Sequence, residues 1–213
     1  MSAVIVAYPP GAGGNHIKNL LCTYPGFGNS SDLNTKVYIE DTQPAGTAHS
    51  KPGRNVTTDL FETVEANLEK CYIIHGHFGE LAPFRQQINR IAKKFILIAF
   101  DNKIDQQLLD NRQGRLGHQQ HHYYIEEEQP FLYRSELYTT YFTANTEDIC
   151  VIPLYEIWHP DLNQHKIVER LNIFLNINMD HSHAQSMHDL WWKNNFNFDF
   201  CNFTRNVYGK TTF

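Results

Sequence analysis

The chain has 213 residues, of which 41% are apolar, and its formal net charge is −5. This length is typical of one domain, and the composition is that of a globular protein with a sizeable core. The negative charge argues against wholesale binding to nucleic acid or anionic membranes, and no apolar run approaches the roughly 18 residues that a membrane span needs.

The N-terminal segment has no basic region before its first turn at Pro9-Pro10-Gly11, so we expect no signal peptide. Four cysteines are scattered along the chain without a Cys-x-x-Cys pair, namely Cys22, Cys71, Cys150 and Cys201. This usage predicts reduced, mostly buried thiols and a cytoplasmic protein.

The first third of the chain begins with a short apolar strand at 2–7, followed by a Gly-rich turn at 9–15 and a helix with Ile17, Leu20 and Leu21 on one face. The segment 24–56 is rich in Gly, Pro, Asn and Ser, and only 36–40 has a strand pattern. We therefore expect a long loop insertion there.

The middle of the chain alternates strands and helices. A helix is predicted from Thr58 or Asp59, with an apolar face at Leu60, Val64 and Leu68. A strand at 71–74 ends in His75-Gly76-His77, a helix covers 81–94, and a third strand at 95–100 ends in Asp101-Asn102.

The last part continues the alternation. Helices are expected at 104–111 and 131–141, separated by a polar loop at 113–120. A strand at 149–154 precedes a helix capped by Asp161, whose buried face carries Ile167, Val168, Leu171, Phe174 and Leu175. A final helix covers 183–193.

This order predicts a single α/β domain over 1–213, with a P-loop-like three-layer α/β/α arrangement and a mostly parallel sheet. Ligands of such folds bind at the carboxyl ends of the strands. Those ends carry the Gly-rich turn, the His75-Gly76-His77 turn and Asp101-Asn102.

The Gly-rich turn has the layout of an anion site, because backbone N–H groups and the helix dipole meet at a helix N-terminus. Gly11, Gly13 and Gly14 permit positive φ angles and close approach of a phosphate. Lys18 lies one turn into the helix, within reach of the same anion. The turn matches neither a Walker A motif nor a dinucleotide fingerprint, because His16 stands where each needs a Gly.

The segment 8–18 resembles the 5′-phosphosulfate-binding loop of sulfotransferases. Further along, 151–158 is similar to the family's strand that ends in Tyr-Glu-Asp-Leu, and the helix at 167–175 shares the family's Phe-Leu ending. The turn at 75–77 matches in place the family's Lys-Thr-His, whose His is the catalytic base. The segment 95–105 falls where the family binds the 3′-phosphate.

The resemblance implies transfer of a sulfuryl group from 3′-phosphoadenosine 5′-phosphosulfate to a hydroxyl or amine of a small-molecule or glycan acceptor, with no nucleic acid or membrane as partner. The donor would be held by the loop and the first turn of the helix, at Gly11, Ala12, Gly13, Gly14, Asn15, His16 and Lys18.

Catalysis of this transfer needs a base for the acceptor proton and a cation near the bridging oxygen. His77 is our preferred base, His75 is the next candidate, and Glu80 is an alternative. Lys18 or His16 would neutralise the bridging oxygen. No metal ligand set is expected for this chemistry.

The chain departs from the family in its 3′-phosphate segment. Asp101, Lys103 and Leu109 stand where the family has Arg, Pro and Ser, and only Asp105 matches. An Asp repels a phosphate. Substitute cations are available at Arg112, Arg115, Arg205 and Lys210. Two alternatives therefore stay open: a member of the fold that binds an anion or nucleotide without transfer, and a kinase-like phosphotransferase, which would lack the usual Lys-Ser/Thr pair.

Three other groups have weaker signals. His118, His121 and His122 have a spacing that would suit a metal on a helix, without a carboxylate or Cys to complete a known motif. Trp191 and Trp192 are expected either in the core or in a substrate wall. The aromatic residues between 123 and 142 either line an acceptor pocket or pack a helix on the sheet.

Overall fold

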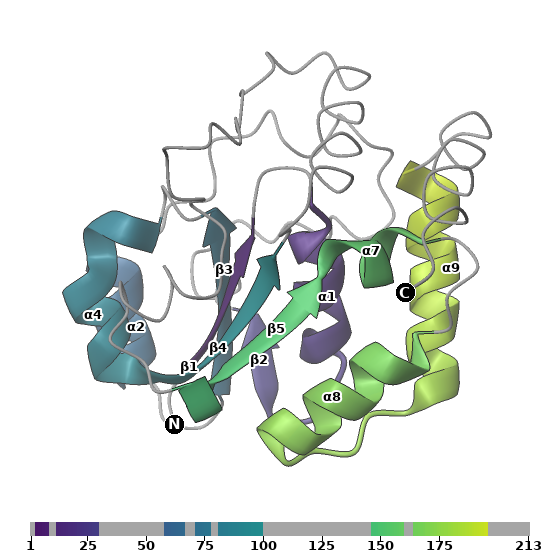
Figure 1. Cartoon of the computed structure of the whole chain (residues 1–213). Coiled ribbons are helices and arrows are strands. Elements are labelled where there is room, and N and C mark those ends of the chain that lie inside the picture. The colour runs from purple at the N-terminus through teal and green to yellow at the C-terminus, as the bar shows by residue number, and fades with distance from the viewer. Residues whose placement is uncertain are drawn as a thin grey trace, which may run out of the picture.

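The computed structural model describes residues 3–8, 12–29, 58–66, 71–77, 81–99, 146–159 and 164–195. They form a five-stranded, all-parallel sheet with helices on both faces, which confirms the predicted three-layer α/β/α arrangement (Figure 1). The strands are β1 (Ala3–Tyr8), β2 (Phe27–Asn29), β3 (Cys71–His77), β4 (Ala92–Ala99) and β5 (Ile149–Pro153). The helices are α1 (Gly14–Cys22), α2 (Thr58–Ala66), α4 (Arg85–Ile91), α7 (Leu154–Trp158), α8 (His165–Leu175) and α9 (His181–Asn195), with 3-10 turns η2 (Ala82–Phe84) and η3 (Thr146–Asp148).

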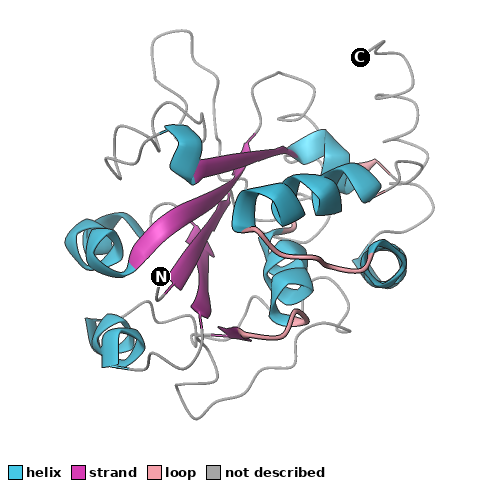
Figure 2. Ribbon diagram, turned by 90° about the horizontal axis from the view of Figure 1, so that it is seen from below, coloured by secondary structure: helices cyan, strands magenta, loops and turns pink. Residues whose placement is uncertain are grey.

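The helices form two layers around the sheet. Helices α2 and α4 cover one face, and α1 and α8 cover the other (Figure 2). Helix α9 is the outermost element of that second layer and packs against both α1 and α8. None of the helices in the described ranges is long and apolar enough to cross a membrane.

Strand β1 is the centre of the core. Each of its six residues is at most 3% exposed, because β3 and β4 flank it and helices cover both its faces. An unbroken apolar run is what such a strand requires. The register pairs Val6 with His75 and Tyr8 with His77, which brings the last residues of β1 beside the two histidines of β3.

The strand order β2-β3-β1-β4-β5 defines where a ligand would bind. In this order β2 lies toward one edge of the sheet from β1, and β5 lies toward the opposite edge from β4, so the connections after β1 and β4 lead to opposite edges. The carboxyl ends of β1 and β4 therefore flank a topological switch point, where open parallel sheets bind their ligands. Tyr8 ends β1 at this edge, next to the first turn of α1.

Strand β2 lies within the segment 24–56 that the sequence predicts to be a loop. Its pairing of Phe27 with Cys71 and Asn29 with Ile73 makes it the edge strand of the sheet beside β3. With only one apolar side chain in three residues, its strand state comes from this pairing rather than from its own pattern. The predicted strand at 36–40 and the helices at 104–111 and 131–141 lie outside the described residues.

Strand β4 begins earlier than predicted. The expected helix over 81–94 ends at Ile91, and Ala92 already pairs with Ala3 of β1. Lys94 is held at this position by an ion pair to Asp148 at 3.4 Å and by the Phe174 ring, 4.7 Å from its ammonium. Pairing with the central strand thus overrides the helix propensity of the Ala-Lys-Lys segment.

Two element boundaries near residue 160 also differ from prediction. The strand over 149–154 ends at Pro153, and Leu154 begins the short helix α7, which buries Leu154, Ile157 and Trp158. Helix α8 begins at His165 with Gln164, not Asp161, in the N-cap position. The predicted buried face of α8 is confirmed for Ile167, Val168 and Leu171, while Phe174 and Leu175 are only partly buried.

Candidate functional site

The turn from β1 into α1 depends on a glycine. Gly13 has a φ of 92°, in the left-handed region, and occupies the N-cap position of α1. Its carbonyl accepts hydrogen bonds from the N–H groups of His16 (3.0 Å) and Ile17 (3.4 Å), which close the first turn. A residue with a side chain is strained in this conformation.

The space beside both glycines is filled by aromatic or aliphatic side chains. A Cβ atom on Gly14 would overlap the ring of Tyr8. A Cβ atom on Gly13 would lie 3.1 Å from Trp191 Cζ2 and 3.2 Å from Ile157 Cγ2. The Cα atom of Gly14 thus makes room for Tyr8, and that of Gly13 for Trp191 and Ile157. Close approach of a phosphate to the backbone stays a prediction, and it would take place on the amide side of the turn.

The N–H groups of this first turn are the donors that an anion would meet at this edge of the sheet. First-turn amides have no acceptor within their own helix, and the helix dipole adds a partial positive charge there. Gly13, Gly14 and Asn15 supply these groups at the carboxyl edge of the sheet. Gly11 lies outside the described residues.

Tyr8 links α1 to β3 through its hydroxyl. Tyr8 Oη donates to Asn15 Oδ1 at 3.1 Å and lies 2.8 Å from His75 Nδ1. The rings of Tyr8 and His75 are nearly parallel, with an interplanar angle of 10° and centroids 6.1 Å apart. The three side chains form a polar group at the edge where ligands are expected, and we call it the Tyr8 triad.

The two histidines of β3 lie in its last three residues, at the carboxyl edge of the sheet. Strand β3 continues through His77, and its backbone register pairs His75 with Val6 and His77 with Tyr8. Of the two predicted bases, His75 belongs to the Tyr8 triad and is half-buried. The side chain of His77 is not part of the described structure.

Lys18 shares the triad's face of α1. It follows Gly14 by four residues and Asn15 by three, which places all three on one side of the helix. Helical side chains lean toward the N-terminus of their helix, and here that direction leads to the edge with the Tyr8 triad. Lys18 is only 3% exposed, although Lys is rarely buried to this extent.

His16 is placed away from this group, at the contact between α1 and α9. It is 2% exposed, stacks on Trp191 with centroids 4.9 Å apart, and meets His188 edge to face at 5.4 Å. Burial, together with the neighbouring His188, lowers the pKa of His16 from 6.5 to about 3. His16 is therefore uncharged at neutral pH, and the prediction that it neutralises a bridging oxygen is corrected.

His188 completes this buried cluster from the α9 side. Its Nε2 lies 2.9 Å from the Ile157 carbonyl oxygen and so carries the hydrogen, and burial lowers its pKa as well. Among the described residues, no hydrogen bond reaches the buried His16 Nε2, and His188 Nδ1 lies 3.8 Å from the Asp189 carboxylate. Trp191, which the sequence allows in the core or in a substrate wall, packs this cluster against Gly13.

Ala12 is also part of the core rather than an exposed loop residue. It is 0% exposed, and its carbonyl accepts a hydrogen bond from Trp158 Nε1 at 3.1 Å. This contact ties the start of α1 to α7.

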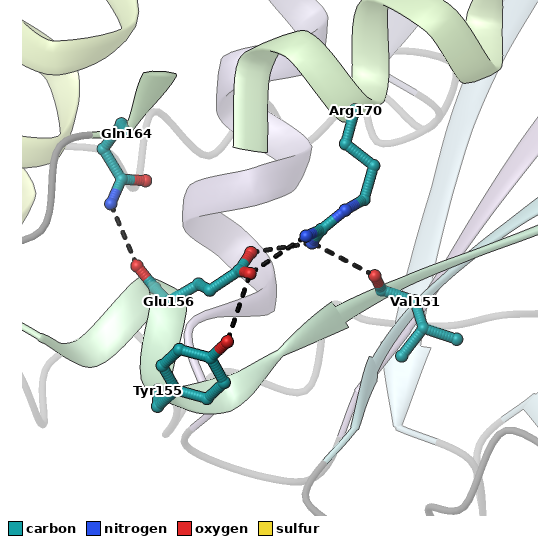
Figure 3. Close-up of polar contacts among 5 residues, drawn as sticks. All are labelled: Val151, Tyr155, Glu156, Gln164 and Arg170. Atoms are coloured by element: carbon teal, nitrogen blue, oxygen red, sulfur yellow. Dashed lines mark hydrogen bonds and ion pairs between the residues drawn. The ribbon is translucent and has the colours of Figure 1, made fainter. Parts of the chain in front are cut away.

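An ion-pair network behind the site fixes α7 against α8 and β5 (Figure 3). Arg170 donates to both carboxylate oxygens of Glu156, at 2.7 and 2.9 Å, and to the Val151 carbonyl at 3.3 Å. The bond to Glu156 raises the pKa of Arg170. Gln164 Nε2 donates to the Glu156 carbonyl at 3.1 Å, while the Tyr155 hydroxyl is 3.5 Å from the carboxylate.

Sequence reasoning does not find this network or the Tyr8 triad. Glu156 is recognisable only as part of the Tyr-Glu match, and nothing in the sequence pairs it with Arg170. In the sequence, Tyr8 follows the predicted strand at 2–7 and is only the first residue of the segment that resembles the 5′-phosphosulfate-binding loop. The remaining predicted positions lie outside the described residues, namely Glu80, Asp101, Lys103, Asp105, Leu109, Arg112, Arg115, His118, His121, His122, Arg205 and Lys210.

Comparisons of the chain with protein-family models, with curated proteins and with solved structures found no significant match. The site is therefore interpreted from its own geometry and chemistry.

Proposed function

We propose that this protein is a sulfotransferase-like enzyme, which moves a sulfuryl group from 3′-phosphoadenosine 5′-phosphosulfate to a hydroxyl or amine acceptor. One observation carries the proposal: the N-terminus of α1, whose first-turn amides can donate to an anion, and a histidine that contacts Tyr8 meet at the carboxyl ends of the central strands. Anionic donor and proton-accepting base are the two elements that this transfer needs.

The roles follow from the positions of the groups. The amides of Gly13, Gly14 and Asn15 would hold the sulfonate or the 5′-phosphate, and Lys18, on the same face of α1, would add the positive charge. His75 or His77 would accept the acceptor proton. The acceptor oxygen or nitrogen then forms its bond to sulfur while the bond from sulfur to the phosphate oxygen breaks, and the nucleotide leaves as the 3′,5′-bisphosphate.

In this proposal the donor binds on the side of the turn where the backbone N–H groups lie. Because Tyr8 and Trp191 occupy the Cβ sides of Gly14 and Gly13, the sulfonate has one direction of approach, toward the first-turn N–H groups. That direction also faces the carboxyl edge, where the acceptor would meet the base.

The cytoplasm is the compartment that we propose for the protein. In the described part of the chain, Cys22, Cys71 and Cys150 form no disulfide. Burial raises the pKa of Cys71 and Cys150 to about 11, which makes them poor nucleophiles and suits a structural role in a reducing compartment.

Calorimetric titration with 3′-phosphoadenosine 5′-phosphate, without added metal, tests the donor. We expect micromolar binding, which Lys18→Met weakens about 10- to 100-fold because a charge-assisted interaction is worth roughly 1.5–3 kcal/mol. Met keeps the apolar stem of the buried Lys. Lys166→Met, on the exposed side of α8, is the matched control and should bind as the wild type does. The donor assignment fails if the wild type does not bind at millimolar ligand.

A binding protein without transfer chemistry is the second candidate. Asp101 favours it, because a carboxylate at the position of the family's Arg repels the 3′-phosphate. Incubation with radiolabelled donor and a panel of hydroxyl and amine acceptors separates the two. Binding without transfer to any acceptor supports the second candidate, and transfer that is lost in His75→Gln supports the enzyme.

A further inference from the structure

Helix α9 packs on the turn between β1 and α1 through Trp191. The ring of Trp191 lies against the Cα of Gly13, 3.1 Å from the position of a Cβ atom there, and stacks on His16 with centroids 4.9 Å apart. The Gly13 carbonyl in turn accepts from the N–H groups of His16 and Ile17. The residue with positive φ that begins α1 is thus backed by α9, so a displacement of α9 acts directly on this turn.

The contact between α9 and the rest of the molecule buries few apolar groups. Among the α9 residues whose exposure is described, Ala184 is the one apolar residue that is fully buried, whereas Leu190 is 48% exposed. Three buried polar atoms at this contact have no hydrogen-bond partner among the described residues, namely His16 Nε2, Gln164 Oε1 and His181 Nδ1. Each such atom has lost its water without a replacement and weakens the contact. A contact of this kind opens at low cost.

Protonation acts on this contact through two histidines, His16 of α1 and His188 of α9. Their rings meet edge to face with centroids 5.4 Å apart, and they are 2% and 1% exposed. Burial holds the pKa of both below 6.5. Two imidazolium rings at this separation would repel each other where little water screens them. Charging the pair therefore favours separation of α9 from α1.

The other charged groups near this pair do not cancel the repulsion. Asp189 lies 3.8 Å from His188 Nδ1, but its side chain is 67% exposed, so water screens its charge. Lys18 follows His16 by two residues on α1 and is therefore rotated from it by about 200° around the helix axis. On α7, the carboxylate of Glu156 is already paired with the arginine of α8.

We propose that α9 is a pH-sensitive clamp on the turn between β1 and α1, closed while His16 and His188 are neutral and released when they take up protons. In the closed state Trp191 backs Gly13, and the first-turn amides of α1 keep one arrangement. Release of α9 removes this backing. The effect of the clamp on anion binding rests on the proposed function, whereas the pH-dependent release of α9 does not.

Hydrogen exchange of the full chain at pH 6.5 and pH 5, followed by mass spectrometry and corrected for the intrinsic exchange rates, measures the release. Peptides of α9 should be less protected than those of β1 and β4, because α9 opens without the sheet. The opening constant of α9 should rise at least about 15-fold between the two pH values, since His16 takes up a proton on opening and its ordinary pKa is 6.5. Equal protection of α9 and the central strands, or an opening constant that is independent of pH, overturns the clamp.

Substitutions assign the pH dependence to the pair. His16→Phe removes the titrating group and keeps a ring against Trp191, so the 15-fold change should be lost; His16→Gln serves the same purpose if the first variant does not fold. His181→Phe is the matched control, because His181 is a partly buried histidine of α9 that stacks on His165 of α8 at 4.0 Å. It should keep the pH dependence of the wild type. Loss of the dependence in His181→Phe alone would assign the release to that other pair and overturn the role of His16.

Addition of 3′-phosphoadenosine 5′-phosphate separates the clamp from the proposed function. A ligand that binds only the closed state should raise the protection of α9 about 10-fold at ten times its Kd, because binding and closure favour each other equally. Binding that leaves the protection of α9 unchanged overturns the action of the clamp on the turn. No binding at millimolar ligand overturns the proposed donor, and the pH dependence of exchange then still decides whether α9 is released.

Discussion

Glu156 is an acidic residue whose charge is met almost entirely by one partner. Its side chain is 9% exposed, and both carboxylate oxygens accept from Arg170, whose side chain is 35% exposed. Removing one member of such a pair leaves the other charge poorly solvated, which is more damaging than the loss of a surface ion pair. The pair also joins α7 to α8, so its loss affects two elements.

Glu156→Gln should therefore destabilise the protein by about 2 kcal/mol, less than for a fully buried pair because Arg170 is partly solvated. Chemical denaturation followed by circular dichroism measures this change. Glu169→Gln removes the same charge from an exposed position on α8, next to Arg170 in sequence, and should change the unfolding free energy by less than about 0.5 kcal/mol. Equal effects of the two substitutions would contradict the role of the pair.

At the scale of elements, the junction of β1 and α1 is held by the contact between the Tyr8 ring and Gly14. In an ordinary helix, Gly→Ala stabilises by roughly 0.5–1 kcal/mol. Here the added methyl overlaps the ring, so Gly14→Ala should destabilise instead, by about 1–3 kcal/mol, as overpacking does in a core. Chemical denaturation of the variant and of the wild type shows whether the substitution lowers or raises the free energy of unfolding.

A double-mutant cycle isolates the cause. In a Tyr8→Ala background the clash is absent, and Gly14→Ala should become neutral or stabilising, which gives a coupling energy of at least about 1 kcal/mol. If the effects of the two substitutions simply add, the contact between the Tyr8 ring and Gly14 is not the cause of the destabilisation. Gly26→Ala is a further comparison, because Gly26 has open space around it but, unlike Gly14, a positive φ, so it reports backbone strain without a clash.

The elements that can be predicted from the sequence are those whose own residues have a strand or helix pattern. β1 is apolar at every position, and α8 buries Ile167, Val168 and Leu171 at helical spacing, so both are predicted correctly. Strand β2 and the early start of β4 cannot be predicted in this way. Phe27 is in a strand because it pairs with β3, and Ala92 because it pairs with β1. Such pairing depends on tertiary structure rather than on local propensity.

At the scale of the whole molecule, the site is built from partners that are distant in sequence. Tyr8 and His75 are 67 residues apart, and Ala12 and Trp158 are 146 residues apart. The sequence indicates the Gly-rich turn and the two histidines of β3, because their residue types and positions after apolar strands are local features. It does not indicate that Tyr8 contacts His75 or that Trp191 covers Gly13, since both depend on how the layers pack.

The buried histidines between α1 and α9 make the stability of the whole protein dependent on pH. His16 has a pKa of about 3 in the folded state and an ordinary value of 6.5, and the pKa of His188 is also lowered. Below pH 6.5 the unfolded chain binds protons that the folded protein does not. The contribution of His16 to stability is thus complete above that pH, and it is lost progressively as the pH falls from 6.5 toward 3.

Denaturation at pH 6.5 and pH 5 should show this loss as about 2 kcal/mol from His16 alone, at roughly 1.4 kcal/mol per pH unit. His16→Phe removes the titrating group and keeps a ring against Trp191. The unfolding free energy of this variant should therefore fall by about 2 kcal/mol less than that of the wild type between pH 6.5 and pH 5. Because only the change between two pH values is compared, any packing defect of the variant cancels. His183→Phe, at an exposed position of α9, should show the same pH dependence as the wild type. An unchanged slope in His16→Phe would mean that His16 is protonated in the folded protein and that the α1–α9 contact tolerates its charge.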